Sequence, residues 1–152
     1  MFSGDRRGPA AGSPVVAHAA DDGVLVADRV LDPRESAENR RWWHACLTAA
    51  GLERTRREEL VLVLHEAVGT VAVLDGGPAG VRVRITREGT EVTGEVHARG
   101  GCPPLPPHAV PPDRRLLMLW LAEKVSPAVT LTVVRAGTGS CVVVRALDPD
   151  RA

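Results

Sequence analysis

Aromatic side chains are scarce in this chain of 152 residues, where they make up 3% of the composition. Apart from Phe2, the only large aromatics are the tryptophans Trp42, Trp43 and Trp120. Lysine is scarcer still, because Lys124 is the only one and all other basic residues are arginines. We attribute this arginine bias to genomic codon usage, so it indicates no function.

An excess of charge of either sign is also missing, since 19 basic residues balance 19 acidic ones. This balance excludes an overall basic surface for nucleic acid and an acidic tail. No apolar run approaches the ~20 residues that span a bilayer, and the N-terminus has no apolar core of signal-peptide length. We therefore expect a cytoplasmic protein that binds neither nucleic acid nor membrane.

Cysteine is limited to Cys46, Cys102 and Cys141, an odd number with no CxxC or CxxH motif. This pattern argues against a disulfide framework and against a zinc module, and it favours a reducing compartment. The nearest approach to a metal-binding set is His97, Cys102 and His108. Their spacing matches no zinc module, and two of them fall in a proline-rich loop. We expect no metal site.

Length and a hydrophobic content of 44% fit one globular domain. Residues 1–20 are rich in Gly, Pro and Ala and predict a flexible N-terminal segment, followed by the domain at 21–148 and a tail at 149–152. Six of the twelve prolines fall in residues 101–112, which excludes a helix or central strand there. Such a long loop is typical of a lid or of a disordered segment.

Apolar periodicity predicts the order of the elements. Asp32 is the expected cap of the first helix, Thr55 and Glu58 form a capping box for the second, and Asp113 caps the third. The order predicts an α+β two-layer sandwich, with a mixed, mostly antiparallel sheet covered by helices on one face. The predicted elements are strand 23–31, helices 32–52 and 53–74, strands 81–89 and 90–100, helix 113–125, and a strand–turn–strand pair over 128–147.

The stretch "LVLHEAVGT", residues 62–70, places Glu66 within an apolar helical run and has no basic residue within several positions. A carboxylate in that position is either catalytic or left over from a chemistry that the chain has partly lost. The simpler alternative is a solvated acid at the margin of a helix, with the neighbouring His65 as a boundary residue.

Order and spacing of these segments resemble the GHKL (histidine kinase-like) ATPase superfamily, and within it the stand-alone anti-sigma regulatory serine/threonine kinases. The resemblance covers about residues 23–147 and rests on spacing more than on identities. It is carried in order by "PRESAENRRWWHACLTAAGL", "LVLHEAVGTVAVL", a hairpin ending in "GEVHARGG", a proline-bearing loop, "DRRLLMLWLAEKV" and "GTGSCVVV".

Two roles in the second helix follow from this resemblance. Glu66 matches the family glutamate that orients or activates the phosphoryl acceptor or water. Thr70 stands where the family has an asparagine that binds the bridging magnesium. A threonine hydroxyl can bind magnesium, but it is shorter than a carboxamide and reaches a different point.

Two further motifs of the family are altered in this chain. The aspartate that reads adenine in D-x-G falls on Ala98, although Gly100 matches the glycine, and the lost hydrogen bond costs about 1.5–3 kcal/mol. In the lid motif G-R-G-L, Arg114 and Leu116 are retained, while Asp113 and Arg115 replace the glycines that let backbone amides close on phosphate. The resemblance therefore implies weak or absent ATP binding. The nucleotide pocket, if it functions, would include Thr70, Gly100, Arg114 and Leu116.

We expect a regulatory protein that resembles an anti-sigma factor and binds a sigma factor or an anti-anti-sigma-like partner, with a homodimer as a further option. It would have no enzyme activity and no cofactor.

Partner contacts are expected at Arg40, Arg41, Trp42 and Trp43, because helix neighbours lie ~100° apart and one tryptophan should face away from the core. Burial of both tryptophans against a loop is the alternative.

The alternative function is an active magnesium–ATP-dependent serine/threonine kinase with Glu66 as the base. A ligand-binding domain that reuses the emptied pocket is a third option.

Overall fold

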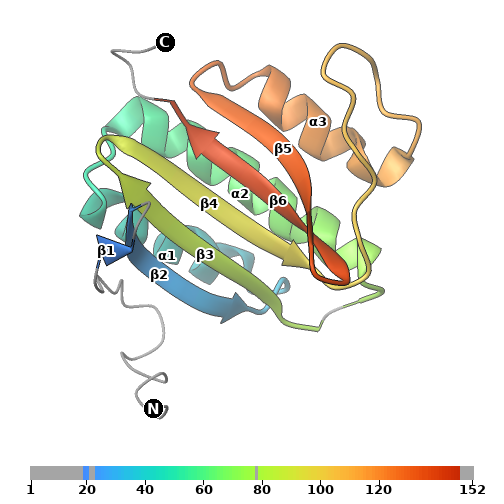
Figure 1. Ribbon diagram of the computed structural model, residues 1–152, viewed down its shortest axis with the longest axis horizontal. Helices are drawn as coiled ribbons and strands as arrows, with labels where there is room; N and C mark the ends of the chain where they lie inside the picture. Colours follow the sequence, from blue (N-terminus) through green and yellow to red (C-terminus); the bar gives the residue numbers. More distant parts are fainter. Residues whose placement is uncertain (1–18, 21–22, 78, 148–152) are drawn as a thin grey trace.

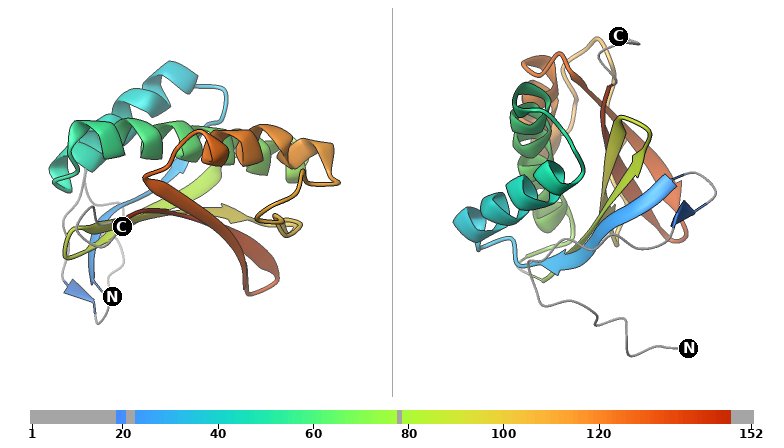
Figure 2. Two further views of the ribbon diagram at one scale, coloured as in Figure 1. Left: turned by 90° about the horizontal axis from the view of Figure 1, so that it is seen from above. Right: turned by 90° about the vertical axis from the view of Figure 1, so that its left-hand side faces the viewer.

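Two layers make up the computed structural model, which describes residues 19–20, 23–77 and 79–147. One layer is a sheet with the strand order β1-β2-β3-β4-β6-β5, and the other consists of helices packed on one face of it (Figures 1 and 2). The strands are β1 (Ala19–Ala20), β2 (Gly23–Leu31), β3 (Val81–Glu88), β4 (Glu91–Ala98), β5 (Val129–Ala136) and β6 (Gly139–Ala146). The helices are α1 (Ser36–Ala49), α2 (Arg54–Leu74) and α3 (Leu117–Lys124), and the 3₁₀ turn η2 (Arg114–Leu116) leads into α3.

The predicted α+β two-layer sandwich is confirmed, with one refinement. Every pair of strands in the described part of the chain is antiparallel, so the sheet is not mixed. Residues 1–18 of the predicted flexible segment and the predicted tail at 149–152 lie outside the described residues. No helix in the described ranges is long and apolar enough to span a membrane.

Helix α2 crosses the centre of the sheet and supplies much of the core. Its side chains Leu60, Leu64, Ala67 and Val71 are fully buried, as their helical spacing predicts. Opposite them, β4 has glycine at position 94. A Cβ at Gly94 would lie 2.7 Å from Cδ2 of Leu64, so the missing side chain lets α2 approach the strand.

One end of α2 is fixed to the sheet by two polar side chains. Arg56 is 7% exposed and donates from Nη2 to the carbonyl oxygens of Thr90, at 2.8 Å, and Ala146, at 3.5 Å. Glu59 accepts a hydrogen bond from the backbone amide of Ala128 at 2.8 Å. These contacts hold the N-terminal end of α2 over the β3–β4 turn and the end of the β5–β6 pair.

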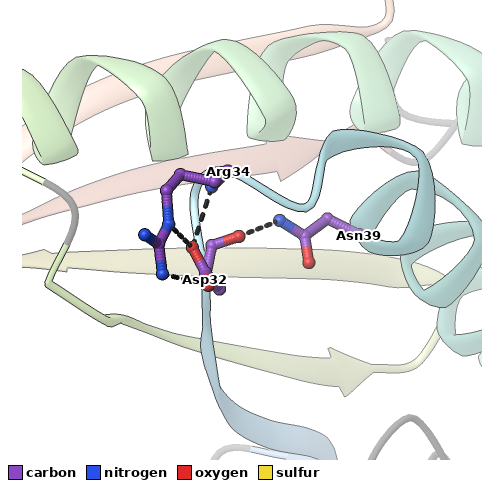
Figure 3. A network of polar contacts seen from close by, with 3 residues as sticks. All are labelled: Asp32, Arg34 and Asn39. Atoms are coloured by element: carbon purple, nitrogen blue, oxygen red, sulfur yellow. Dashed lines mark hydrogen bonds and ion pairs between the residues drawn. The ribbon is translucent and has the colours of Figure 1, made fainter.

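Helix α1 starts later than the sequence predicts, and Asp32 is not its cap. The carboxylate of Asp32 accepts hydrogen bonds from the backbone amide and the guanidinium of Arg34, at 2.9–3.0 Å (Figure 3). Its carbonyl oxygen accepts one from Nδ2 of Asn39 at 2.8 Å. Asp32 therefore opens the turn before the helix, and its carbonyl oxygen also accepts a hydrogen bond from the backbone amide of Glu35 at 3.0 Å. The helix itself begins at Ser36, with Glu35 as its N-cap residue.

The other two predicted caps have different outcomes. Helix α2 begins at Arg54 with Glu53 as its N-cap residue, so Thr55 lies inside the first turn and the expected capping box with Glu58 does not form. Asp113 does act as a cap, but of the 3₁₀ turn η2 and not of α3, whose N-cap residue is Leu116. Its side chain accepts a hydrogen bond from the backbone amide of Arg115 at 3.0 Å. Residues 101–112 contain neither helix nor strand, as their prolines predict.

Candidate functional site

A cavity of about 590 Å³ opens where the loop after β4 meets the β5–β6 hairpin. Its wall combines glycine backbone, two guanidinium groups, two hydroxyls, one thiol and apolar side chains. The lining residues are Leu74, Gly100, Gly101, Cys102, Pro103, Pro104, Arg115, Val133, Val134, Arg135, Thr138, Gly139 and Ser140.

Hydrogen bonds from two sides hold the glycine loop of this cavity. The carboxylate of Asp75, just past the end of α2, accepts bonds from the backbone amides of Arg99 and Gly100, both at 3.1 Å. The side chain of Asp75 is only 4% exposed. On the other side, the backbone amide of Cys102 donates to Oγ of Ser140 at 3.0 Å. The loop is therefore attached to both α2 and β6.

Gly139 lets the β5–β6 hairpin come close to the end of β4. A Cβ at this position would clash with the carbonyl oxygen of Ala98 and lie 2.9 Å from that of Arg99. No side chain fits against this backbone, so the glycine is required for the two walls of the cavity to meet.

The charged wall of the cavity is formed by Arg115 and Arg135, and the guanidinium of Arg115 is already paired. Its Nε and Nη2 atoms donate to the carboxylate of Asp113 at 3.0 and 2.7 Å. These hydrogen bonds lower the pKa of Asp113 to about 2. Burial, together with the negative charge of Asp113, raises the pKa of the Cys102 thiol to about 11. Because Asp113 neutralises Arg115, the net positive charge of the wall comes from Arg135. This charge beside the hydroxyls of Thr138 and Ser140 suits an anionic ligand better than a neutral one.

The residues that the sequence assigns to catalysis and magnesium do not border this cavity. Glu66 and Thr70 precede Leu74 by eight and four residues on α2, so they lie about 12 and 6 Å back along the helix axis. Thr70 is 6% exposed. Glu66 is half-buried, and its side chain makes no hydrogen bond or ion pair with any described residue.

Of the expected nucleotide-pocket residues, Gly100 alone is part of the lining. Ala98 is 3% exposed and belongs to the core between sheet and helices. Leu116 is fully buried where η2 packs against α2. Arg114 is exposed, and the neighbouring Arg115 is the arginine that faces the cavity.

The expectation that one of the paired tryptophans faces solvent is wrong. Trp42 is 4% exposed and Trp43 is fully buried, with their ring centroids 5.1 Å apart. Helix α1 packs against both α2 and β2, so residues ~100° apart on it both meet protein. The guanidinium of Arg29 covers the outer ring, 5.2 Å from the centroid of Trp42. The structure thus leaves Arg40 and Arg41 as the exposed members of the expected partner surface.

Helix α3 instead carries an exposed apolar stripe, which the sequence analysis did not identify. Met118 and Leu121 of α3 and Val125, its C-cap residue, are 58%, 40% and 66% exposed, at a helical spacing of three and four residues. On the inner side, Leu119 and Ala122 are buried. The signal in the sequence is that "LLMLWLA" is apolar on every side of the helix, which exceeds what one core-facing side requires.

A second polar cluster, on the paired strands β4 and β6, has no member in the lining of the cavity. The ligand atoms of Glu95, His97 and Cys141 all lie within 4.8 Å of one another, a spacing that could hold a metal ion. The set considered in the sequence differs, because neither Cys102 nor His108 joins His97. Pairing of β4 with β6 brings Cys141 to this histidine.

No protein-family model, no curated protein and no solved structure matches this chain.

Proposed function

We propose that this chain is a regulatory binding protein that acts in the manner of an anti-sigma factor in the cytoplasm. It holds a sigma factor or an anti-anti-sigma-like protein through direct contact and binds nucleotide weakly or not at all. The observation that carries the proposal is the exposed apolar stripe of α3, formed by Met118, Leu121 and Val125.

The geometry of the stripe favours a helical partner segment. Its three residues are spaced i, i+3 and i+7, which is the seam through which one helix packs along another. Met118 and Val125 are 58% and 66% exposed, so each has apolar surface that a partner can bury. An apolar helix of a partner protein is therefore the occupant that this surface fits.

Weak nucleotide binding is supported by what stands at the positions that the resemblance assigns to the ligand. The adenine position holds the methyl group of Ala98, which is 3% exposed and accepts no hydrogen bond. The two lid positions that have glycine in the family hold Asp113 and Arg115, which bind each other at 2.7 Å. Thr70 is 6% exposed, so its hydroxyl offers little surface to a hydrated magnesium ion.

The stripe can be tested with a charge-bearing double variant and a matched control. Met118→Glu combined with Leu121→Glu places two carboxylates on the stripe, while Val73→Glu places one on α2 at a residue that is 58% exposed. Proteins captured from extracts of the source cell are identified by mass spectrometry, and the recovered partner is then purified and titrated against each variant. Circular dichroism verifies that each variant is folded.

We expect a sigma factor or a regulator of one to be recovered with the wild type and with Val73→Glu. The double variant should bind it about 30-fold or more weakly, since hot-spot contacts contribute about 2 kcal/mol or more. Capture of no such protein contradicts the proposed function. Unchanged affinity of the double variant contradicts the assignment of the surface. If the wild type is a dimer that the double variant dissociates, the occupant is a second copy of this chain.

A second candidate function is an active magnesium–ATP-dependent serine/threonine kinase. The observation in its favour is that Gly100 and Arg115 line one cavity together with the hydroxyls of Thr138 and Ser140. A titration with a fluorescent ATP analogue in magnesium separates the two functions. The regulatory binding protein shows no saturation up to about 1 mM, while a kinase binds near micromolar concentration. In a kinase, Glu66→Gln abolishes phosphoryl transfer with little effect on binding.

A further inference from the structure

The face of the sheet opposite the helices has no helix packed on it in the described part of the chain (Figure 2). Side chains alternate along a strand, so Glu95 and His97 of β4 both point to this open face, while Val96 between them is buried beneath α2. On the neighbouring strand β6, Cys141 is the direct partner of His97. Directly paired side chains have Cβ atoms about 4.5–5.5 Å apart, so the three residues share one small patch.

This patch contains a buried nitrogen without a hydrogen-bond partner. Nε2 of His97 is buried, and it neither donates a hydrogen bond to a described residue nor accepts one from it. Its closest charged neighbour is Oε1 of Glu95, at 3.5 Å. Cys141 completes the patch and is 3% exposed. Buried polar atoms are nearly always paired, and an orphan is explained by strain, by a water molecule or by an ion.

We propose that Glu95, His97 and Cys141 form a zinc-binding site on the open face of the sheet, with water in the fourth coordination position. Imidazole nitrogen, thiolate sulfur and carboxylate oxygen are the three ligand types of protein zinc sites, and three protein ligands with one open position are typical of accessible ones. A mixed N, S and O set favours zinc over magnesium or calcium, which require oxygen ligands.

The distances fit a tetrahedral site after a small movement. Ligand bonds of about 2.0–2.3 Å place the donor atoms of a tetrahedron about 3.3–3.8 Å apart. The 3.5 Å between His97 Nε2 and Glu95 Oε1 already has this length. No two of the ligand atoms lie more than 4.8 Å apart, so side-chain rotations that shorten a distance by about 1 Å at most complete the tetrahedron.

Charge around the patch comes from β3 and from β2. A carboxylate and a thiolate carry two negative charges, which a zinc ion neutralises. Arg84 is the direct partner of Glu95 on β3, and its Nε lies 3.4 Å from Asp28 Oδ2. Arg82 also binds Asp28, at 2.8 Å. Asp28 thus engages both guanidinium groups on the side away from the cluster.

Apolar side chains flank the patch on its other sides. Val143 pairs with Glu95 on β6, and Val134 pairs with Cys141 from β5. They supply no competing ligand, and they lower access of water to the thiol. Glu95 and His97 are 30% and 29% exposed at the side chain, which leaves the route by which an ion enters.

The test uses the full chain without a histidine tag, reduced and stripped of metal with a chelator. Zinc binding is measured by calorimetry and by competition with a chromogenic chelator. Cobalt, which adopts the same geometry, reports the ligands by its visible absorption and by a thiolate charge-transfer band in the near ultraviolet. We expect one ion per chain, with a dissociation constant below about 1 μM, and a charge-transfer band from one thiolate.

Ligand variants and matched controls locate the site. Cys141→Ser should remove the charge-transfer band, and His97→Gln and Glu95→Gln should weaken zinc binding by more than about 100-fold, because even outer-shell partners contribute 10–100-fold. Cys102→Ser and His108→Gln should change neither. Binding that survives Cys141→Ser and His97→Gln reports an adventitious ion elsewhere and overturns the proposal. The absence of binding at about 100 μM zinc also overturns the proposal. In that case the contact between His97 and Glu95 is a histidine–carboxylate pair and not part of a metal site.

Discussion

Asp75 and Gly100, 25 residues apart in the chain, are joined by a hydrogen bond of 3.1 Å from the backbone amide of Gly100 to the carboxylate of Asp75. The same carboxylate accepts a bond from the amide of Arg99. It therefore takes two successive amides of the loop that lines the cavity and ties them to the end of α2.

Replacement of Asp75 by alanine should destabilise the protein by about 2 kcal/mol, because two hydrogen bonds to a charged acceptor are lost at once. Urea denaturation followed by circular dichroism measures the change. Glu58→Ala is the matched control, since it removes an exposed ion pair with Arg54 and should change stability by less than about 0.5 kcal/mol. Equal effects of the two substitutions would show that Asp75 does not hold the loop.

Trp43→Ala should destabilise the protein by about 3–5 kcal/mol, since it removes a fully buried indole from the core. Arg41→Ala, two residues earlier on the exposed side of α1, should change stability by no more than about 0.5 kcal/mol. Thermal and chemical denaturation distinguish the two. If Trp43→Ala leaves stability unchanged while it weakens partner binding, the tryptophan belongs to an interface and not to the core.

Gly139→Ala should lower stability by about 1–3 kcal/mol, because its methyl group meets the carbonyl oxygens of Ala98 and Arg99 and backbone cannot rotate away as a side chain can. Gly100→Ala provides the comparison within the same cavity wall. The nearest atom to a Cβ there is Oδ1 of Asp75 at 3.7 Å, an ordinary contact, so this variant should stay close to wild type. Comparable melting temperatures for both variants would contradict the close approach at Gly139.

The acid–base behaviour of Asp113 predicts a pH dependence at the start of α3. Its hydrogen bonds with Arg115 lower the pKa to about 2, so the folded state binds this proton less readily than the unfolded chain does. The contribution to stability is therefore fully present above about pH 4 and is lost as the pH falls through about 2. An NMR titration of the carboxyl carbon should show the low midpoint, and Arg115→Ala should move it upward. Asp113→Asn should flatten the loss of stability between pH 4 and 2.

Local sequence patterns predicted the elements well where the residues of one segment are enough to define its secondary structure. The second helix was expected at 53–74 and occupies Arg54–Leu74, because its apolar stripe and the glycine turn after it suffice to define it. The start of α1 was predicted too early, because the preference of Asp32 for capping lost to a closer cation at Arg34. Helix propensity alone therefore does not predict whether Asp32 caps the helix or binds Arg34.

The candidate sites depended on pairings that no single segment reveals. Asp75 lies in a turn, and its partners at Arg99 and Gly100 become visible only when α2 crosses the end of β4. Cys141 meets His97 through the register between β4 and β6. The burial of both tryptophans could likewise not be predicted from helical spacing, because it depends on the packing of α1 against both α2 and β2.

The position of β6 between β4 and β5 has a consequence for synthesis of the chain. It is the last of the described strands to be made, yet it occupies an inner place in the sheet. Until residues Gly139–Ala146 have left the ribosome, β4 and β5 each expose an unsatisfied edge, the kind of surface on which chains associate. A nascent or truncated chain that ends before β6 should therefore associate with other chains more readily, whereas the addition of these eight residues covers both edges at once.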